Sequence, residues 1–342
     1  MNEPILEFDH LSVSFLTRQG EVEALRDLSL SLHRGEVLAI VGESGSGKSV
    51  LCKAAMKLLS GNAVYKQGQI RLNGENIVPF SETKMRSLRG RIFSMIFQDP
   101  MLTLDPTMPI GSQIMESIFQ HQKATPAAAR ARALELLQRT GIPEPEERFD
   151  LQPHFFSGGM RQRCVLAAAL AAAPEILFAD EPTTALDVTL QAQMIDLIKE
   201  MQKELALSVL FISHDLSVVA RIADRVAVMY AGKIIEIGTA EDIFYDPRHP
   251  YTRCLLKASP ASARRGQSLY SIPGMPPSLL HPPQGDAFAP RNPYAMAIDY
   301  KEMPPFYRIS DTHSAATWLL DERAPRIAMP EFSIGKEDCR LG

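Results

Sequence analysis

A loop rich in glycine and serine constrains the fold of this chain more than any other stretch of its sequence. The loop reads GESGSGKS over residues 42–49 and matches the pattern GxxxxGK[ST]. The run EVLAIVG, which leads into it, is continuously apolar, as in a strand that is covered on both faces of a sheet. The segment KSVLCKAAMKLL, which follows, has the apolar spacing of a helix. A buried strand, a glycine loop and a helix in this order predict an α/β fold.

The chemistry of this loop is that of a phosphate site. Its glycines allow consecutive backbone N–H groups to turn inward around a phosphate at the positive end of a helix dipole. The pattern assigns Lys48 to the β- and γ-phosphates and the Ser49 hydroxyl to Mg²⁺. A flexible surface turn is the alternative, but the pattern arises by chance in roughly one chain of this length in a hundred. We therefore expect the whole loop to bind nucleotide: Gly42, Glu43, Ser44, Gly45, Ser46, Gly47, Lys48 and Ser49.

Two further apolar runs end in residues that suit phosphate chemistry. EILFAD ends in Asp180, with Glu181 next, and a carboxylate at the end of a buried strand needs a partner. Asp180 is suited to ligate Mg²⁺ directly or through water, and Glu181 to orient or polarise an attacking water. A helix-capping acidic pair is the alternative. LSVLFISHDLS leads to His214, which alone would more often be structural but beside these groups would bond the γ-phosphate.

The stretch FSGGMRQR, residues 156–163, indicates a second phosphate site. Ser157 is placed to cap a helix, and Gly158 and Gly159 behind it expose backbone donors at that helix N-terminus. Two anion sites that each begin their own helix cannot easily surround one nucleotide. Two chains arranged head to tail, each closing the site of the other, are therefore the simplest arrangement. A helix cap without a ligand is the alternative, and it would be favoured for this motif alone.

Composition excludes several classes of protein. A chain of 342 residues predicts one core of about 250 residues with an appendage, or two domains. No apolar run approaches the roughly 18 residues of a membrane span, and the N-terminus lacks the pattern of a signal peptide. Four widely spaced cysteines suit a reducing, cytosolic compartment. With 36 basic and 40 acidic residues and no long run of either sign, nothing indicates a nucleic-acid partner.

Taken together, the motifs resemble those of ABC-transporter ATPases. Besides the stretches above, the glutamine of IFQDP and the D-loop TALD occur in the family's order and spacing, over about residues 5–238. The resemblance implies a P-loop, RecA-like ATPase core with an antiparallel β subdomain and an inserted helical subdomain. It implies that Phe15 stacks on adenine, although Phe15 is equally plausible as a sheet residue, and that Asp187 of the D-loop lies at the nucleotide. It implies that Gln98 joins Glu181 and His214 in catalysis and Ser49 and Asp180 at Mg²⁺, and links this site to the membrane partner.

Four longer stretches resemble one subfamily, the importer ATPases for dipeptides, oligopeptides or nickel. They read MIFQDPMLTLDPTMPIG, FSGGMRQR, ADEPTTALDVTLQAQ and PRHPYTRCLL. The resemblance implies a peripheral subunit at the cytoplasmic face of the inner membrane that hydrolyses ATP to power peptide import. Its implied partners are two permease subunits, a second ABC ATPase that is a copy or a paralogue, and an extracytoplasmic binding protein, without nucleic acid. Nickel or another small solute is the alternative cargo. An ABC ATPase that acts on DNA or ribosomes is the alternative from another class, but such proteins usually carry a long coiled coil or two modules.

The same resemblance divides the chain into an ATPase domain over residues 1–250 and a C-terminal extension over residues 251–342. Amphipathic spacing predicts a helical subdomain over about residues 99–173, with the Pro-rich segment GIPEPEERFDLQPHFF as a link between two of its helices. The extension is rich in proline and lacks periodicity, so we expect a tail dominated by loops and packed on the core or on a partner.

The tail departs from its subfamily at four positions where relatives commonly carry cysteines that can hold an iron–sulfur cluster. The aligned residues are Asp286, Asn292, Asp299 and Thr317. Because such clusters need thiolate ligands, we predict no cluster and a tail held by packing and polar contacts. A divalent-cation site that uses Asp286 and Asp299 is the alternative, and a solvated loop is the expectation.

Overall fold

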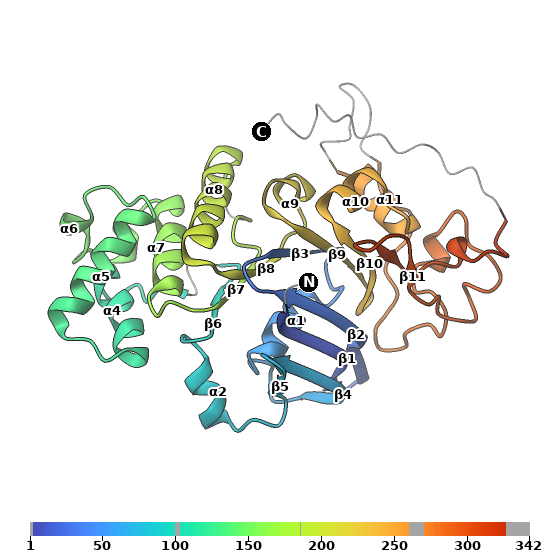
Figure 1. The fold of residues 1–342 in the computed structure, drawn as a ribbon, viewed down its shortest axis with the longest axis horizontal. Helices are drawn as coiled ribbons and strands as arrows, with labels where there is room; N and C mark the ends of the chain where they lie inside the picture. Colours follow the sequence, from blue (N-terminus) through green and yellow to red (C-terminus); the bar gives the residue numbers. More distant parts are fainter. Residues whose placement is uncertain (1–2, 100–102, 185, 260–269, 326–342) are drawn as a thin grey trace. The chain divides into compact units, whose positions relative to one another are not determined.

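The computed structural model describes residues 3–99, 103–184, 186–259 and 270–325 (Figure 1). The chain divides into two compact units. The first comprises Met1–Glu3, His33–Glu36 and Pro79–Ile212, and the second comprises Pro4–Leu32, Val37–Val78 and Ser213–Gly342. The phosphate loop therefore belongs to the second unit, and the acidic pair belongs to the first.

An antiparallel sheet lies in the second unit and confirms the antiparallel β subdomain that the resemblance implies (Figure 1). Its order is β2-β1-β4-β5, from β1 (Pro4–Thr17), β2 (Gly20–His33), β4 (Ala63–Leu72) and β5 (Glu75–Asn76). In the register of β1 and β4, Leu6 lies opposite Leu72 and Phe8 lies opposite Ile70. All four side chains are buried. Burial of one face fixes this register, because a shift by one residue would expose the whole apolar set.

A second sheet in the same unit carries the phosphate loop. Its strands are β3 (Val37–Val41) and β9 (Arg225–Tyr230), which pair in parallel, followed by the antiparallel β10 (Lys233–Thr239), β12 (Ser314–Ala315) and β11 (Tyr307–Arg308). The α-helices in the described part of this unit are α1 (Lys48–Ala55), α9 (Leu216–Ile222), α10 (Ala240–Tyr245) and α11 (Pro250–Lys257). Every residue of β3 is buried, as its continuous apolar run predicts. Helix α1 ends short of the predicted Leu59, because Lys57 takes a left-handed φ of 51°.

Three parallel strands form the sheet of the first unit. They are β6 (Phe93–Ile96), β7 (Ile176–Asp180) and β8 (Ser208–Ile212), in the order β8-β7-β6. Two helices, α2 (Glu82–Leu88) and α8 (Val188–Leu205), accompany them. Every residue of β7 and β8 is buried. Asp180 therefore stands at the carboxyl end of a buried parallel strand, the edge at which α/β sheets bind ligands.

Helices occupy most of the segment from residue 110 to residue 170. They are α4 (Ile110–His121), α5 (Pro126–Arg139), α6 (Pro145–Arg148) and α7 (Gly158–Leu170). Helices α4, α5 and α7 pack against one another, as Figure 1 shows in green. The Pro-rich link is more ordered than predicted, since it holds α6 and the 3₁₀ turn η1 (Pro153–Phe155). Both begin with proline, whose fixed φ suits the first position of a helix.

The C-terminal tail packs on the second sheet with little regular structure of its own, as its composition predicts. Besides most of α11 and the strands β11 and β12, its described residues contain the 3₁₀ turns η3 (Ala289–Arg291) and η4 (Trp318–Leu320). Phe288 of the tail contacts Tyr230 of β9 and Tyr251 of α11, with ring centroids 5.5 and 5.3 Å apart. All three rings are buried. Aromatic pairs of this kind add about 0.5–1.5 kcal/mol each beyond the area they bury, so they anchor the tail.

The expectation of a solvated loop at Asp286 and Asp299 is wrong. These side chains are only 4% and 1% exposed. Asp286 Oδ1 accepts a hydrogen bond of 2.9 Å from the N–H of Phe288, and Asp299 Oδ2 accepts one of 2.6 Å from the N–H of Met296. A Pro-rich segment can bury carboxyl groups in this way, because turns supply backbone donors close by in the chain.

The other two positions that align with cysteines of the relatives are also buried and also accept hydrogen bonds from nearby backbone N–H groups. Asn292 and Thr317 are 8% and 1% exposed. Their side-chain oxygens accept from the N–H groups of Tyr294 and Leu319, two residues further along the chain in each case. Within the ranges that the structure describes, no group of three or more His, Cys, Asp or Glu side chains could hold a metal ion. The absence of an iron–sulfur cluster stays a prediction.

The burial of Asp286 predicts an unusual pH dependence of stability. Burial raises the pKa of this carboxyl from 3.8 to about 6; the bond from Phe288 opposes the rise and the Asp299 charge adds to it. The folded protein then holds a proton that the unfolded chain has lost, so the contribution of Asp286 is fully present below about pH 4 and is lost as pH rises through about 6. Asp286→Asn should raise the free energy of unfolding at pH 7.5 by about 1–3 kcal/mol and should have little effect at pH 4, as measured by urea denaturation.

Asp311→Asn is the matched control for this measurement, because Asp311 lies in the same tail with its side chain 94% exposed. Equal unfolding free energies for Asp286→Asn and the unaltered chain at pH 7.5 would contradict the prediction.

Candidate functional site

The phosphate loop joins β3 to α1 through backbone conformations that require glycine. Gly42 has a φ of 153° and Gly47 has a φ of 106°. Residues other than glycine rarely adopt these values. A Cβ at Gly42 would lie 2.1 Å from the carbonyl oxygen of Met229, and one at Gly47 would lie 2.6 Å from that of Ala24. The two glycines therefore let the loop lie directly against neighbouring backbone.

The same loop presents groups that suit an anion. Ser46 is 4% exposed, and its Oγ has no hydrogen-bond partner among the residues described. Gly45 has a φ of 77°, and nothing lies within 4 Å of the position its Cβ would take, so the loop is open at this point. A buried hydroxyl without a partner costs free energy, which a phosphate oxygen would recover. The residues present therefore fit the predicted phosphate group.

The ammonium group of Lys48 lies across the loop. Nζ donates to the carbonyl oxygens of Gly42 and Glu43 at 2.8 and 2.9 Å, and the residue is 6% exposed. A buried cation needs such partners. Held there, it can neutralise an anion bound by the loop amides.

Glu181 lies in the first unit, where polar side chains hold its carboxylate. It follows Asp180 with a φ of 49°, and its N–H donates to the carbonyl of Ile212 at 3.0 Å. Its Oε2 accepts from Gln98 Nε2 at 3.1 Å and from Thr184 Oγ1 at 2.9 Å. A positive φ at a residue other than glycine is uncommon and often marks a functional site. The first unit thus brings together two predicted catalytic residues, Gln98 and Glu181, that lie 83 positions apart.

The helix that begins at FSGGMRQR is capped as predicted. Ser157 is the N-cap of α7, and its Oγ accepts from the N–H of Met160 at 3.3 Å. Gly158 is exposed, with nothing within 4 Å of its Cβ position, whereas Gly159 is buried against Leu190. An open N-terminus on a helix of 13 residues leaves N–H donors directed at solvent, where an anion can bind.

The structure also places three further predicted residues. Asp187 caps α8, and its Oδ1 accepts from the N–H of Leu190 at 2.9 Å. Phe15 is half-buried near the end of β1, opposite Ala63. His214 is exposed and precedes the N-cap of α9. The loop, Phe15 and His214 belong to the second unit, whereas the acidic pair, Gln98, the α7 cap and Asp187 belong to the first.

Sequence reasoning missed the residues that support the loop from the C-terminal side. Tyr251 Oη accepts from the N–H of Glu43 at 2.8 Å, and Arg291 makes an ion pair with the Glu43 carboxylate at 2.7 Å. Tyr251 lies in PRHPYTRCLL, a stretch that indicated only the resemblance to the importer ATPases. Its aromatic ring and the preceding proline gave no indication of a contact with the loop.

Comparison with known proteins identifies the family of this chain. Residues 25–184 match the family model for ABC transporters, and residues 235–298 match that for the C-terminal region of oligopeptide/dipeptide transporters. The chain is 55% identical over 329 residues to the oligopeptide transport ATP-binding protein OppD of Bacillus subtilis, covering 96% of this chain and 92% of that one. It belongs to the ATP-binding proteins of oligopeptide and dipeptide ABC transporters. The dipeptide transport ATP-binding protein DppD of Lactococcus lactis is 54% identical, over 95% of this chain and 93% of that one.

Solved structures confirm the fold of this ABC ATPase. A dimer of the ATP-binding cassette MJ0796, in a post-hydrolysis state with ADP and phosphate, matches with a TM-score of 0.62 at 24% identity, over 69% of this chain and 98% of that one. The cbiO1 protein of Clostridium perfringens, part of the cbiONQ transporter complex, matches with a TM-score of 0.62 at 29% identity, over 72% and 92%. The chain thus has the ABC cassette fold with its antiparallel β subdomain.

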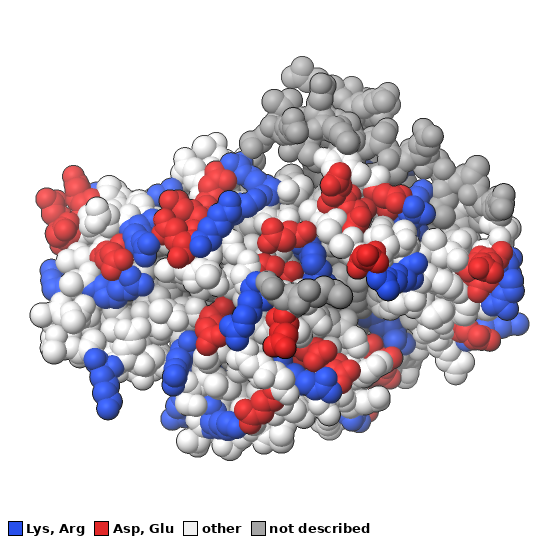
Figure 2. All heavy atoms as spheres, in the orientation of Figure 1, with Lys and Arg blue, Asp and Glu red and all other residues white. Residues whose placement is uncertain are grey.

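Basic and acidic side chains are intermixed on the face of this ABC ATPase that Figure 2 shows, which agrees with its small net charge of −4. None of the helices in the described ranges is both long and apolar enough to cross a membrane.

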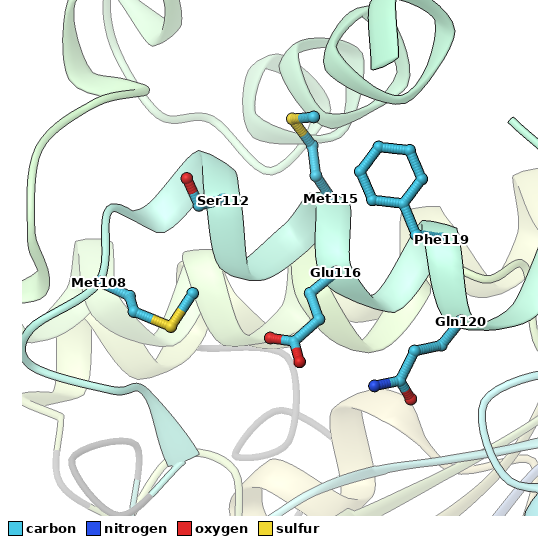
Figure 3. A pocket seen from close by; sticks show the side chains of 6 residues that line it. All are labelled: Met108, Ser112, Met115, Glu116, Phe119 and Gln120. Atoms are coloured by element: carbon cyan, nitrogen blue, oxygen red, sulfur yellow. The ribbon is translucent and has the colours of Figure 1, made fainter. Parts of the chain in front are cut away.

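An open pocket lies along helix α4 of the ABC ATPase (Figure 3). Its volume is about 490 Å³, and its lining consists of Met108, Ser112, Met115, Glu116, Phe119 and Gln120. The five lining residues within α4 recur at intervals of three and four positions, which places them along one side of the helix. Phe119 remains 44% exposed. Large apolar side chains in an open pocket are typical of a surface that binds a partner.

Proposed function

We propose that this chain binds ATP at residues 42–49 and hydrolyses it with Glu181 to drive import of oligopeptides or dipeptides. The observation that carries the proposal is the Glu181 carboxylate, which Gln98 and Thr184 hold at the end of a buried strand. The printed functions of the OppD and DppD relatives support peptides as the cargo.

In the proposed site, the loop amides and Lys48 bind the phosphates, and Phe15 stacks on adenine. Ser49, Gln98 and Asp180 would hold Mg²⁺, which neutralises charge on the phosphate oxygens when it is bound. Oxygen ligands of this kind, a hydroxyl, an amide and a carboxylate, are those that Mg²⁺ prefers.

Glu181 is proposed to position the attacking water. The bonds from Gln98 and Thr184 to Oε2 fix the plane of the carboxylate, so that it accepts a proton from a water in a defined direction. His214 donates a hydrogen bond to the γ-phosphate, where charge accumulates during transfer.

The open end of α7 is proposed to act on the nucleotide of a second subunit. Ser157, Gly158 and Gly159 would contact that phosphate group, and Asp187 would lie at the boundary between the subunits. The MJ0796 cassette, which has the same fold, forms a dimer, and this supports a pair of ATPase subunits. The partner subunit is a second copy or a paralogue.

The complete transporter is proposed to contain this ATPase pair, two transmembrane permease subunits and an extracytoplasmic binding protein, with the ATPases peripheral at the cytoplasmic face of the membrane. The test is affinity purification of the tagged chain from gently solubilised native membranes, with identification of every stoichiometric companion. Two multispanning proteins and an ATPase support the proposal, and a binding protein specific for nickel would correct its cargo. Ribosomal proteins or DNA-processing subunits as companions would overturn it.

The pocket on α4 is proposed to receive a helix of the permease. Phe119→Ser should reduce the recovery of permease in the same purification by about tenfold or more, because an aromatic side chain in a pocket commonly dominates binding. Phe306→Ser is the matched control, since Phe306 is a similarly exposed phenylalanine of the tail, at 49% against 44%. Equal recovery of permease with Phe119→Ser and Phe306→Ser would remove α4 from the interface.

A further inference from the structure

The second residue of the phosphate loop is held through its amide, its carbonyl and its carboxylate. The N–H of Glu43 donates to Tyr251 Oη at 2.8 Å, and its carbonyl accepts from Lys48 Nζ at 2.9 Å and from the N–H of Ser46 at 3.2 Å. Its carboxylate accepts from the two terminal nitrogens of Arg291 at 2.7 and 3.0 Å. A residue of the C-terminal tail therefore holds the side chain of a loop residue that lies 248 positions away in the chain.

The guanidinium of Arg291 is fully engaged at this place. Besides the two bonds to Glu43, it donates to the carbonyls of Pro273 and Ile272 at 2.8 and 3.5 Å and to Tyr230 Oη at 3.1 Å. These five contacts match the five N–H donors of an arginine. The side chain is 5% exposed, against 22% for Glu43. Arg291 is thus buried and Glu43 partly buried in an ion pair of two bonds, unlike the exposed pairs that contribute little to stability.

The position of the pair matters because of its charge. A carboxylate within a loop that holds phosphate opposes an anionic ligand, and the opposition is strongest where water is excluded. Arg291 cancels that charge. By fixing the carboxylate it also holds residue 43 where its carbonyl meets Lys48. Lysine in its place would supply the charge but not two parallel bonds.

We propose that Arg291 is a positioning residue for nucleotide binding, which from the C-terminal tail neutralises Glu43 and holds the phosphate loop in its binding shape. The inference rests on the proposed function, because it concerns the same loop. The tail then sets the affinity of this ATPase for nucleoside di- and triphosphates, in addition to packing on the sheet.

A double-mutant cycle on the full chain tests the inference, with Mg²⁺-ADP as the probe and isothermal titration calorimetry as the readout. Arg291→Met should raise the Kd about tenfold, because it leaves a carboxylate without its partner beside the bound phosphates. The double variant Glu43→Gln with Arg291→Met should return the Kd to within about threefold of the unaltered chain, since no uncompensated charge remains. Arg291→Lys should fall between the two.

Arg308→Met is the control, because Arg308 pairs with Asp311 in the same tail but is 72% exposed. Its Kd should not change. The melting temperature of each variant is measured alongside, since a purely structural role would lower it without changing the Kd. An unchanged Kd in Arg291→Met, or a double variant that binds as weakly as the single one, overturns the inference. Failure of the unaltered chain to bind Mg²⁺-ADP would instead overturn the proposed function.

Discussion

Glu181→Gln is expected to slow ATP hydrolysis at least about a hundredfold while ATP binding persists, as the loss of a general base should. The substitution preserves shape: the amide oxygen of glutamine can still accept from Gln98 and Thr184, which bond Oε2 in the structure. What disappears is the negative charge that orients a water and accepts its proton. The effect should therefore fall on turnover and not on affinity.

The measurement is phosphate release by the detergent-purified transporter, together with the Kd for Mg²⁺-ATP. Glu175→Gln is the matched control, because Glu175 immediately precedes β7 and its ion pair with Arg34 is exposed at the surface. Turnover of Glu181→Gln close to that of the unaltered transporter would remove Glu181 from its proposed role.

Lys48→Ala is expected to abolish ATP binding, with a rise in Kd of at least about a hundredfold, equivalent to about 2.7 kcal/mol. Two effects act in the same direction. The phosphates lose the nearest cation, and the carbonyls of Gly42 and Glu43 lose the ammonium group that bonds both of them in the structure. Without these two hydrogen bonds, the nucleotide-free loop is held less firmly in the conformation that binds phosphate.

Calorimetric titration with Mg²⁺-ATP measures this loss, and Lys53→Ala in the same helix is the control. Lys53 lies in the last turn of α1, at the other end of the helix from the loop, where its charge suits the helix dipole. Affinity retained by Lys48→Ala would show that Lys48 takes no part in binding.

The parts of the fold that sequence reasoning predicts are those whose signal is local. The buried strand β3, the glycine loop and α1 are contiguous, so apolar spacing and glycine positions define them together. The cap at Ser157 is likewise readable, because the capping residue and the helix it begins are neighbours.

Contacts between distant residues carry no such signal. The resemblance assigns Gln98 to the site, and the apolar run before it assigns Glu181, but the hydrogen bond between them spans 83 positions and depends on the neighbouring parallel strands β6 and β7. The pair of Glu43 and Arg291 spans 248 positions, from a loop to a 3₁₀ turn, without any periodicity that could have indicated it. The burial of Asp286 was misread, because polar residues among prolines usually indicate exposure and the compensating N–H lies in a turn with no distinctive sequence.

The ion pair between the loop and the tail also bears on how such proteins can diversify. Residues 43 and 291 form a largely buried pair of opposite charge, and a substitution that removes one partner leaves the other charge without compensation. A substitution at either position should therefore preserve nucleotide binding only when the other position changes with it. A tail exchanged between relatives must carry a residue at position 291 that is compatible with residue 43. We therefore expect the ATPase and its extension to vary together, although they match separate family models.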